Sequence, residues 1–397
     1  MNEYKWKSHI TRFLSAQTIS LLGSSIVQYA IIWYITLTTS SGKMITLSTL
    51  CGFLPQILIS FFAGVWIDRY NRKKIVIITD CLIAIATLIL ALSFLSGHKN
   101  IWLLFIVLAI RSAGTGVQTP AVNAMIPQIV PTGYLMKING IHSTLSSIMM
   151  FVSPAISGAV LSIATLEETL FIDVLTALVG MGITATVPIA SLKLEHSITK
   201  SHAAKIREGI AYLKHHNFIR NLLIYQLLIL FLISASAFLT PLMVSRTFGT
   251  EIWRLTMSEM TYSLGMIIGG VIITSWGGFK KKLNTTLAAG GFYGILMISL
   301  GMAPAFVVYL ICNMLIGVTS PCYNTPITVS IQENVEAELQ GRIFSFMQIT
   351  SSCALPLGML FYGPLADITN IQNLFIISGS LVFGISTVVY ILSRSQS

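Results

Sequence analysis

Long apolar stretches, separated by short polar segments, recur along the whole chain. Each stretch is close to the roughly 20 residues that a helix needs to cross about 30 Å of hydrocarbon. Backbone groups in lipid have no water to bond, so stretches of this length must be helices and not strands. We therefore predict twelve transmembrane helices, near residues 13–37, 44–66, 75–96, 101–120, 138–164, 169–190, 218–242, 256–275, 283–302, 305–325, 342–362 and 371–392.

The longest polar interval, residues 191–217, follows the sixth apolar stretch. We interpret it as a linker between two six-helix halves, residues 1–190 and 218–397. The predicted fold is thus an all-α membrane protein with twelve transmembrane helices in two pseudo-symmetric halves.

An internal repeat supports this division. The pattern G-V-x-[TS]-P-x-x-N occurs at residues 116–123 and again at 317–324, in the fourth and tenth predicted helices. Gly140 and Gly341 follow the two copies at the same interval. Parallel repeats of this kind predict a transporter whose substrate site lies near the membrane midplane, between the repeats, and works by alternating access.

Composition agrees with lipid as the medium. Hydrophobic residues make up 54% and charged residues 10%, with a mean hydropathy of +0.80, whereas soluble domains carry about 25% charge. The net charge of +10 comes from short basic clusters between the apolar stretches, a pattern that does not suit nucleic-acid binding. With both termini cytoplasmic, only four of the 24 lysines and arginines fall in outer loops: Lys43, Lys99, Arg246 and Arg254. This bias predicts a multi-pass cell-membrane protein in that orientation.

Motifs for other functions are missing from the sequence. The five cysteines are scattered, with neither a CxxC pair nor a nearby histidine, so we expect no metal site. No GxSxG, HExxH or Walker sequence is present, so we expect neither an enzyme nor a cofactor.

One polar loop carries a specific pattern. Residues 64–74 read Gly-Val-Trp-Ile-Asp-Arg-Tyr-Asn-Arg-Lys-Lys. This resembles the loop between helices two and three of the major facilitator superfamily, G-x-x-x-D-[RK]-x-G-R-[RK]-[RK], with Asn71 in place of a glycine. We expect Asn71 to tolerate a left-handed turn, because asparagine adopts that conformation more readily than most residues.

In this interpretation the loop is a conformational latch. Gly64 would allow close helix packing, and Asp68 would meet an arginine or a helix N-terminus of the other half. Asp80, in the third helix, would pair with Arg69 or Arg72. The alternative is a simple positively charged anchor at the membrane surface.

Charged residues inside the predicted spans are the next candidates, because burying charge in lipid is costly and usually functional. Arg111 and the glycines after it resemble the superfamily's fourth-helix motif, which implies proton coupling; the alternative is a structural ion pair. Asp173 lies early in the sixth span, where we expect it near the outer interface, and it is a further candidate for proton coupling. Glu259, in the eighth span, is the better candidate for binding a proton or cation, although an interfacial position is an equal alternative.

The fifth span contains Ser153-Pro154-Ala-Ile-Ser157-Gly158, which resembles the antiporter motif G-P-x-x-G-G and implies export. Polar and aromatic residues at helical spacing predict a roomy, mostly apolar substrate cavity, although such stripes also hold helices together. The cavity candidates are Gln28, Tyr29, Trp33, Tyr225, Phe238 and Gln348.

Across the whole chain, segments such as Gly52-Phe-Leu-Pro55-Gln, Ile110-Arg111-Ser-Ala-Gly-Thr115 and Trp276-Gly-Gly-Phe279 resemble the macrolide-efflux drug:proton antiporters of Gram-positive bacteria. The resemblance implies a monomer that exports small amphipathic drugs, macrolides foremost, using the proton gradient. A separate ATP-binding resistance protein is a candidate partner. Export of an endogenous metabolite, such as a siderophore or a peptide, is the alternative.

Overall fold

The structure is a computed structural model that describes residues 3–188 and 215–395, so most of the predicted linker 191–217 lies outside the described residues. Within them the fold is all-helical, as predicted, with twelve helices long and apolar enough to cross a membrane. A 3₁₀ turn, Thr132–Tyr134, precedes α5. The helices are α1 (Glu3–Thr39), α2 (Gly42–Arg69), α3 (Arg72–Leu95), α4 (Ile101–Ile129), α5 (Leu135–Ile163), α6 (Leu166–Thr186), α8 (Asn217–Thr247), α9 (Ile252–Trp276), α10 (Lys282–Gly301), α11 (Phe306–Asn334), α12 (Ala337–Ile368) and α13 (Ile371–Ser395).

Several helices continue past the apolar stretches that predicted them. The fourth span was expected to end at Pro120, but α4 runs through Pro120 and Pro127 to Ile129. Similarly, α11 runs through Pro321 and Pro326 to Asn334. Proline is tolerated inside membrane helices because neighbouring helices and side chains satisfy the backbone groups that it frees. These prolines therefore do not end α4 or α11.

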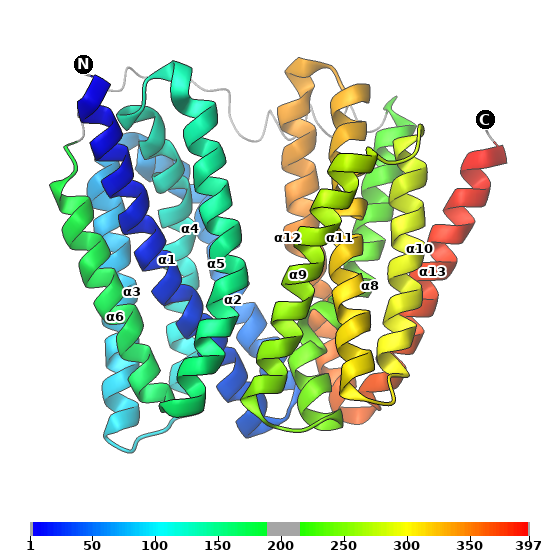
Figure 1. Ribbon diagram of the computed structural model, residues 1–397, viewed down its shortest axis with the longest axis horizontal. Helices are drawn as coiled ribbons and strands as arrows, with labels where there is room; N and C mark the ends of the chain where they lie inside the picture. Colours follow the sequence, from blue (N-terminus) through cyan, green and yellow to red (C-terminus); the bar gives the residue numbers. More distant parts are fainter. Residues whose placement is uncertain (1–2, 189–214, 396–397) are drawn as a thin grey trace. The chain divides into compact units, whose positions relative to one another are not determined.

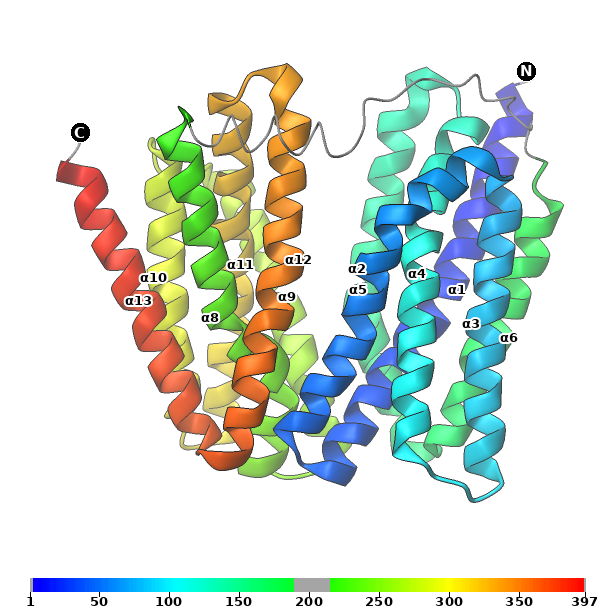
Figure 2. The ribbon, with the colours of Figure 1, turned by 180° about the vertical axis from the view of Figure 1, so that it is seen from behind.

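The described chain forms two compact units. Unit 1 contains Met1–Thr39, Leu47–His196 and Glu251–Thr256, and unit 2 contains Ser40–Thr46, Ser197–Thr250 and Met257–Ser397. In unit 1, α1 packs against α5 and α6, while α3 packs against α4 and α6 (Figure 1). In unit 2, α8 packs against α12 and α13, while α10 packs against α11 and α13 (Figure 2). The two units therefore share one helix-packing pattern in the same chain order.

The repeated motif contributes equivalent helix contacts in both units. A Cβ atom added to Gly116 of α4 would lie 2.6 Å from the backbone oxygen of Gln56 in α2. A Cβ atom added to Gly317 of α11 would likewise meet the backbone oxygen of Tyr262 in α9. Both glycines thus permit a close backbone approach that a side chain would block. Gly140, by contrast, has no atom within 4 Å of such a Cβ. Close packing at Gly140 therefore does not explain why Gly140 and Gly341 follow the two copies of the repeat at the same interval.

Candidate functional site

A buried ion pair joins four helices inside unit 1. Arg111 of α4 pairs with Asp173 of α6. The same guanidinium donates to Thr87 Oγ1 of α3 at 2.6 Å and to the carbonyl oxygen of Ser24 in α1 at 2.9 Å. Asp173 accepts from the hydroxyls of Ser24 at 2.8 Å and Thr87 at 2.9 Å. The pair is therefore part of a closed polar network and is not exposed to lipid.

Burial changes the interpretation of Asp173. Its side chain was expected at the outer interface, but the residue is 0% exposed and Arg111 is 4% exposed. Asp173 lies seven residues into α6, about 10 Å along the helix from its start. Because α6 packs against both α1 and α3, this face points into the unit. The interfacial prediction for Asp173 was wrong.

Asp80 forms a second polar layer in the same unit. Its Oδ1 accepts from Ser20 Oγ of α1 at 2.9 Å and from Gln118 Nε2 of α4 at 2.6 Å. The predicted pairing with Arg69 or Arg72 does not occur in the described structure. Asp80 lies eight residues after Arg72, which places it about 12 Å along α3 from the loop. Asp80 is therefore not part of the loop cluster.

The loop that carries the superfamily-like motif has a different geometry from the predicted one. Asn71 does not adopt a left-handed conformation; its φ is −63° and its ψ is 114°. Instead its side chain caps α3 by accepting from the backbone N–H of Lys73 at 3.0 Å, which satisfies a donor that every helix start leaves unpaired. A Cβ added to Gly64 would meet nothing within 4 Å, so the predicted close packing at Gly64 is absent.

Two basic residues of the motif bond backbone carbonyls of neighbouring helices, Lys73 at the end of α6 and Arg72 five residues before the end of α4. Lys73 Nζ donates to the carbonyls of Ala185 at 2.6 Å and Val187 at 2.9 Å, where α6 ends. Arg72 Nη1 donates to the Ala124 carbonyl of α4 at 2.7 Å. Cations are favourable at helix C-termini, where carbonyls lack partners. These contacts tie α3 to its own unit.

The other members of the proposed latch are less defined. Arg69 is exposed, and the side chain of Asp68 lies outside the part of the chain that the structure describes. The latch therefore stays a prediction.

The antiporter-like motif of α5 contributes helix packing in unit 1. Ser153 and Ser157 are both 0% exposed, and Ser157 Oγ donates to the carbonyl of Ile26 in α1 at 3.0 Å. A Cβ added to Gly158 would lie 2.9 Å from the Cβ of Thr256, which belongs to the same unit. Pro154 lies within the helix and does not end it. Serine and glycine thus bring α5 close to its neighbours.

Glu259 of α9, the candidate for binding a proton or cation, lies in unit 2. It is partly buried, and in the described residues it makes no hydrogen bond or ion pair; Tyr262 and Tyr309 are its electrostatic neighbours. A carboxylate at this position without a cation is costly in lipid. It can accept a proton or a cationic group.

The predicted cavity residues divide into two groups. Trp33 is 1% exposed and Tyr225 is 4% exposed, and Tyr225 bonds the Ser386 hydroxyl of α13 at 2.9 Å. These two rings pack inside the protein and offer no surface to a ligand in this structure. The remaining four are more accessible: Gln28, Tyr29 and Phe238 are partly exposed, and Gln348 is exposed.

The sequence interpretation missed a clasp around Asp367 in unit 2. This carboxylate, near the end of α12, accepts from Ser41 Oγ at 2.8 Å and from the backbone N–H groups of Gly42 at 2.6 Å and Lys43 at 3.0 Å. Arg246 of α8 donates to it at 3.0 Å. Anions are stabilised at helix N-termini, so Asp367 caps the start of α2. An acid and an arginine in separate predicted outer loops were the available signal in the sequence.

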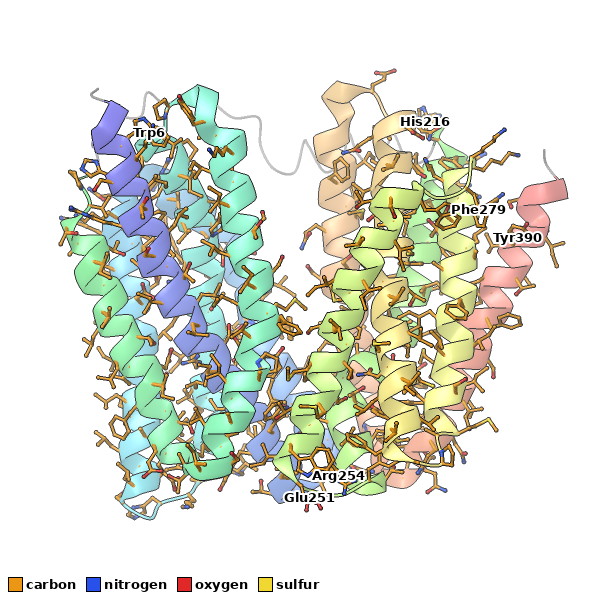
Figure 3. All side chains as sticks on the ribbon, in the orientation of Figure 1. Trp6, His216, Glu251, Arg254, Phe279 and Tyr390 are labelled. Atoms are coloured by element: carbon orange, nitrogen blue, oxygen red, sulfur yellow. The ribbon has the colours of Figure 1, made fainter. Side chains whose placement is uncertain are left out.

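Two further ion pairs lie at helix ends. Lys99 Nζ is 2.7 Å from Glu167 Oε1, and this contact raises the pKa of Lys99. Glu251 and Arg254, seen together at the start of α9 in Figure 3, are 2.8 Å apart. A hydrogen bond from its own backbone N–H, followed by the charge of Arg254, lowers the pKa of Glu251. In each pair one partner is 53% exposed, and pairs that are open to solvent in this way contribute little to stability.

Comparison with known proteins adds an independent finding. A sequence model of the Major Facilitator Superfamily matches residues 13–357. Macrolide efflux protein A of Streptococcus pyogenes is 32% identical over 392 residues, covering 98% of this chain and 97% of that protein. The staphyloferrin A transporter of Staphylococcus aureus is 24% identical and covers 96% of each chain. The solved structure of a POT family transporter with 5-aminolevulinic acid superposes with a TM-score of 0.73 at 12% identity, over 97% of this chain and 96% of that one.

Proposed function

This chain belongs to the major facilitator superfamily, and we propose that it exports amphipathic drugs, foremost macrolide-type antibiotics, by proton antiport. The observation that carries the proposal is 32% identity to macrolide efflux protein A along 98% of the chain. The antiporter-like motif of α5 adds support for export. The protein is a multi-pass membrane protein of a transporter family, and we propose that both termini lie in the cytoplasm because of the distribution of basic residues.

The charged side chains inside the two units differ: those of unit 1 include an ion pair, and Glu259 of unit 2 has no cationic partner among the described residues. This difference suggests that the units have different roles in transport. Arg111 and Asp173 neutralise one another and hold α1, α3, α4 and α6 of unit 1 together. Glu259 of unit 2 has no such partner among the described residues, so it is free to take up a proton or a cationic substrate. An alternating-access exporter needs one group whose charge changes during the cycle, and Glu259 meets that need.

The proposal is tested with purified protein in proteoliposomes. A labelled macrolide such as erythromycin should move against its gradient when a proton gradient is imposed, and a protonophore should abolish that movement. The Glu259→Gln variant should lose proton-driven transport, while the Glu333→Gln variant, an exposed carboxylate of α11, should keep it. Equal macrolide movement in protein-free and protein-containing vesicles would refute drug efflux.

The latch and the partner are separate parts of the proposal. Asp68→Asn should slow transport while leaving membrane insertion unchanged, and wild-type turnover in this variant would count against a latch. We propose that the protein transports as a monomer; a separate ATP-binding resistance protein is a candidate partner. Proteoliposomes that contain this chain alone test whether a partner protein is needed, because transport by a partner-dependent protein would be absent.

A second candidate is export of an endogenous metabolite, such as a siderophore or a peptide. The match to the staphyloferrin A transporter favours it, because that relative spans the whole chain at 24% identity. A strain lacking this protein should then accumulate an internal metabolite that the wild-type strain releases, with unchanged susceptibility to macrolides. Unchanged metabolite pools together with increased macrolide susceptibility would favour drug efflux.

A further inference from the structure

Unit 1 holds three buried carboxylates but only one buried cation in its described part. The buried charged side chains there are Asp80, Arg111, Glu167 and Asp173. Glu167 pairs with the exposed Lys99 at the helix end, and Arg111 pairs with Asp173. Asp80, 3% exposed, is left without a cation. We propose that Asp80 is a proton-binding site, occupied by a proton in this structure, and that its charge state acts on the Arg111–Asp173 pair.

The hydrogen bonds of Asp80 match those of a neutral acid. Both donors, Ser20 Oγ and Gln118 Nε2, bond the same oxygen, Oδ1. The other oxygen, Oδ2, is buried and accepts from no group in the described structure. A protonated carboxyl has one carbonyl oxygen, which accepts, and one hydroxyl oxygen, which carries the proton. An ionised carboxylate would instead leave a charged oxygen buried without a partner, which costs several kcal/mol.

Among the described groups around Asp80, no cation is available to neutralise an ionised Asp80. From α1, its partner is the uncharged Ser20, and Gln17 and Ser24, which share the helical face of Ser20, are also uncharged. From α4 they are Gln118 and, two turns away, Arg111, whose Nη groups bond Asp173, Thr87 and Ser24. From α6 the acting charge is that of Asp173, which has the same sign as an ionised Asp80. A proton therefore neutralises Asp80 at no cost to the ion pair.

Two polar layers are stacked along the same three helices. On α1, Ser20 bonds Asp80 while Ser24 bonds Asp173, four residues or roughly 6 Å further along. On α3 the corresponding residues are Asp80 and Thr87, seven residues apart. On α4, Gln118 and Arg111 are also seven residues apart, about 10 Å along the axis.

This stacking couples the two carboxylates. When Asp80 loses its proton, two negative charges share the single cation Arg111. Loss of the proton therefore weakens the hold of Arg111 on Asp173, and with it the network that joins four helices. A buried site of this kind can bias one arrangement of the helices over another.

The proton site itself does not depend on the proposed export, whereas its role in transport rests on that function. The test is pH-difference infrared spectroscopy of the purified protein in lipid nanodiscs, which detects the carbonyl stretch of protonated carboxyls. The wild type should show such a band at neutral pH that disappears as the pH rises, and Asp80→Asn should lose it. The matched control is Asp367→Asn, since Asp367 is paired with Arg246 and capped by backbone N–H groups; its band should equal that of the wild type. A band unchanged in Asp80→Asn overturns the proposal.

A second measurement needs no variant. Labelling aspartate with ¹³C at the side-chain carboxyl shifts the band of a protonated aspartate but leaves that of a protonated glutamate, such as Glu259, in place. We expect a shifted band, and its absence would overturn the proposal even if Asp80→Asn failed to fold. A titrating Asp80 in a protein that moves no macrolide would leave this inference intact and refute the proposed export, so the two failures are distinguishable.

Discussion

The Arg111–Asp173 pair allows a quantitative test of how unit 1 is held together. The perturbation is Asp173→Asn, which removes the negative charge but keeps the size of the side chain. Arg111, at 4% exposed, would then be a buried cation whose remaining partners are neutral: Thr87 and the carbonyl of Ser24. Breaking a buried pair by removing one partner costs about 3–5 kcal/mol, because an uncompensated charge remains.

That loss corresponds to a change of roughly two to three and a half orders of magnitude in the folding equilibrium, since 1.4 kcal/mol is a factor of ten. The double variant Arg111→Met with Asp173→Leu removes both charges. Replacing a buried pair by apolar residues is often neutral or stabilising, so the double variant should recover most of the stability lost in Asp173→Asn. Its proton-driven transport should stay impaired if the pair also serves coupling.

The assay is reversible unfolding of the purified protein in mixed micelles, followed for the wild type, Asp173→Asn, the single variants Arg111→Met and Asp173→Leu, and the double variant. A thermodynamic cycle then isolates the interaction energy of the two residues. Glu167→Gln is the control, because its partner Lys99 is exposed and should contribute little. The reasoning is refuted if Asp173→Asn unfolds within about 0.5 kcal/mol of the wild type, or if the double variant is no more stable than the single ones.

Three further variants test packing and capping. Gly116→Ala should cost about 1–3 kcal/mol of unfolding free energy because its Cβ would meet the α2 backbone, whereas Gly182→Ala, with open space around it, should not destabilise. Asn71→Ala should cost about 1 kcal/mol through loss of the α3 cap and Asn71→Asp should retain the cap; equal stability of the two would refute the capping role. Asp367→Asn should speed amide hydrogen exchange at residues 42 and 43, measured by mass spectrometry, because the anion that binds those two N–H groups is lost. Unchanged exchange there would mean that the clasp does not order the start of α2.

Several properties of the protein were readable from the linear sequence. The number and places of the helices followed from the length of the apolar stretches, because a helix in lipid must satisfy its own backbone and span a set thickness. The repeat that contains Gly116 and Gly317 also indicated two related halves; the structure adds that these glycines make equivalent contacts, between α2 and α4 and between α9 and α11.

The partners of the buried charges were not readable in this way. Helical spacing shows which residues share a face, but it does not show which neighbouring helix that face meets. Asp80 and Asp173 were both acids in predicted spans, and the sequence placed the first with the loop and the second at the interface. The structure instead places Asp173 with Arg111 and leaves Asp80 without a cation.

The sequence alone thus determined that this chain spans a membrane twelve times in two related halves, because hydrophobic length and repeat are properties of local sequence. Only the tertiary structure decided which charges neutralise each other and which remains unpaired. Those pairings depend on the rotation and packing of α1, α3, α4 and α6, which bring residues as far apart in sequence as Ser24 and Asp173 within 2.8 Å.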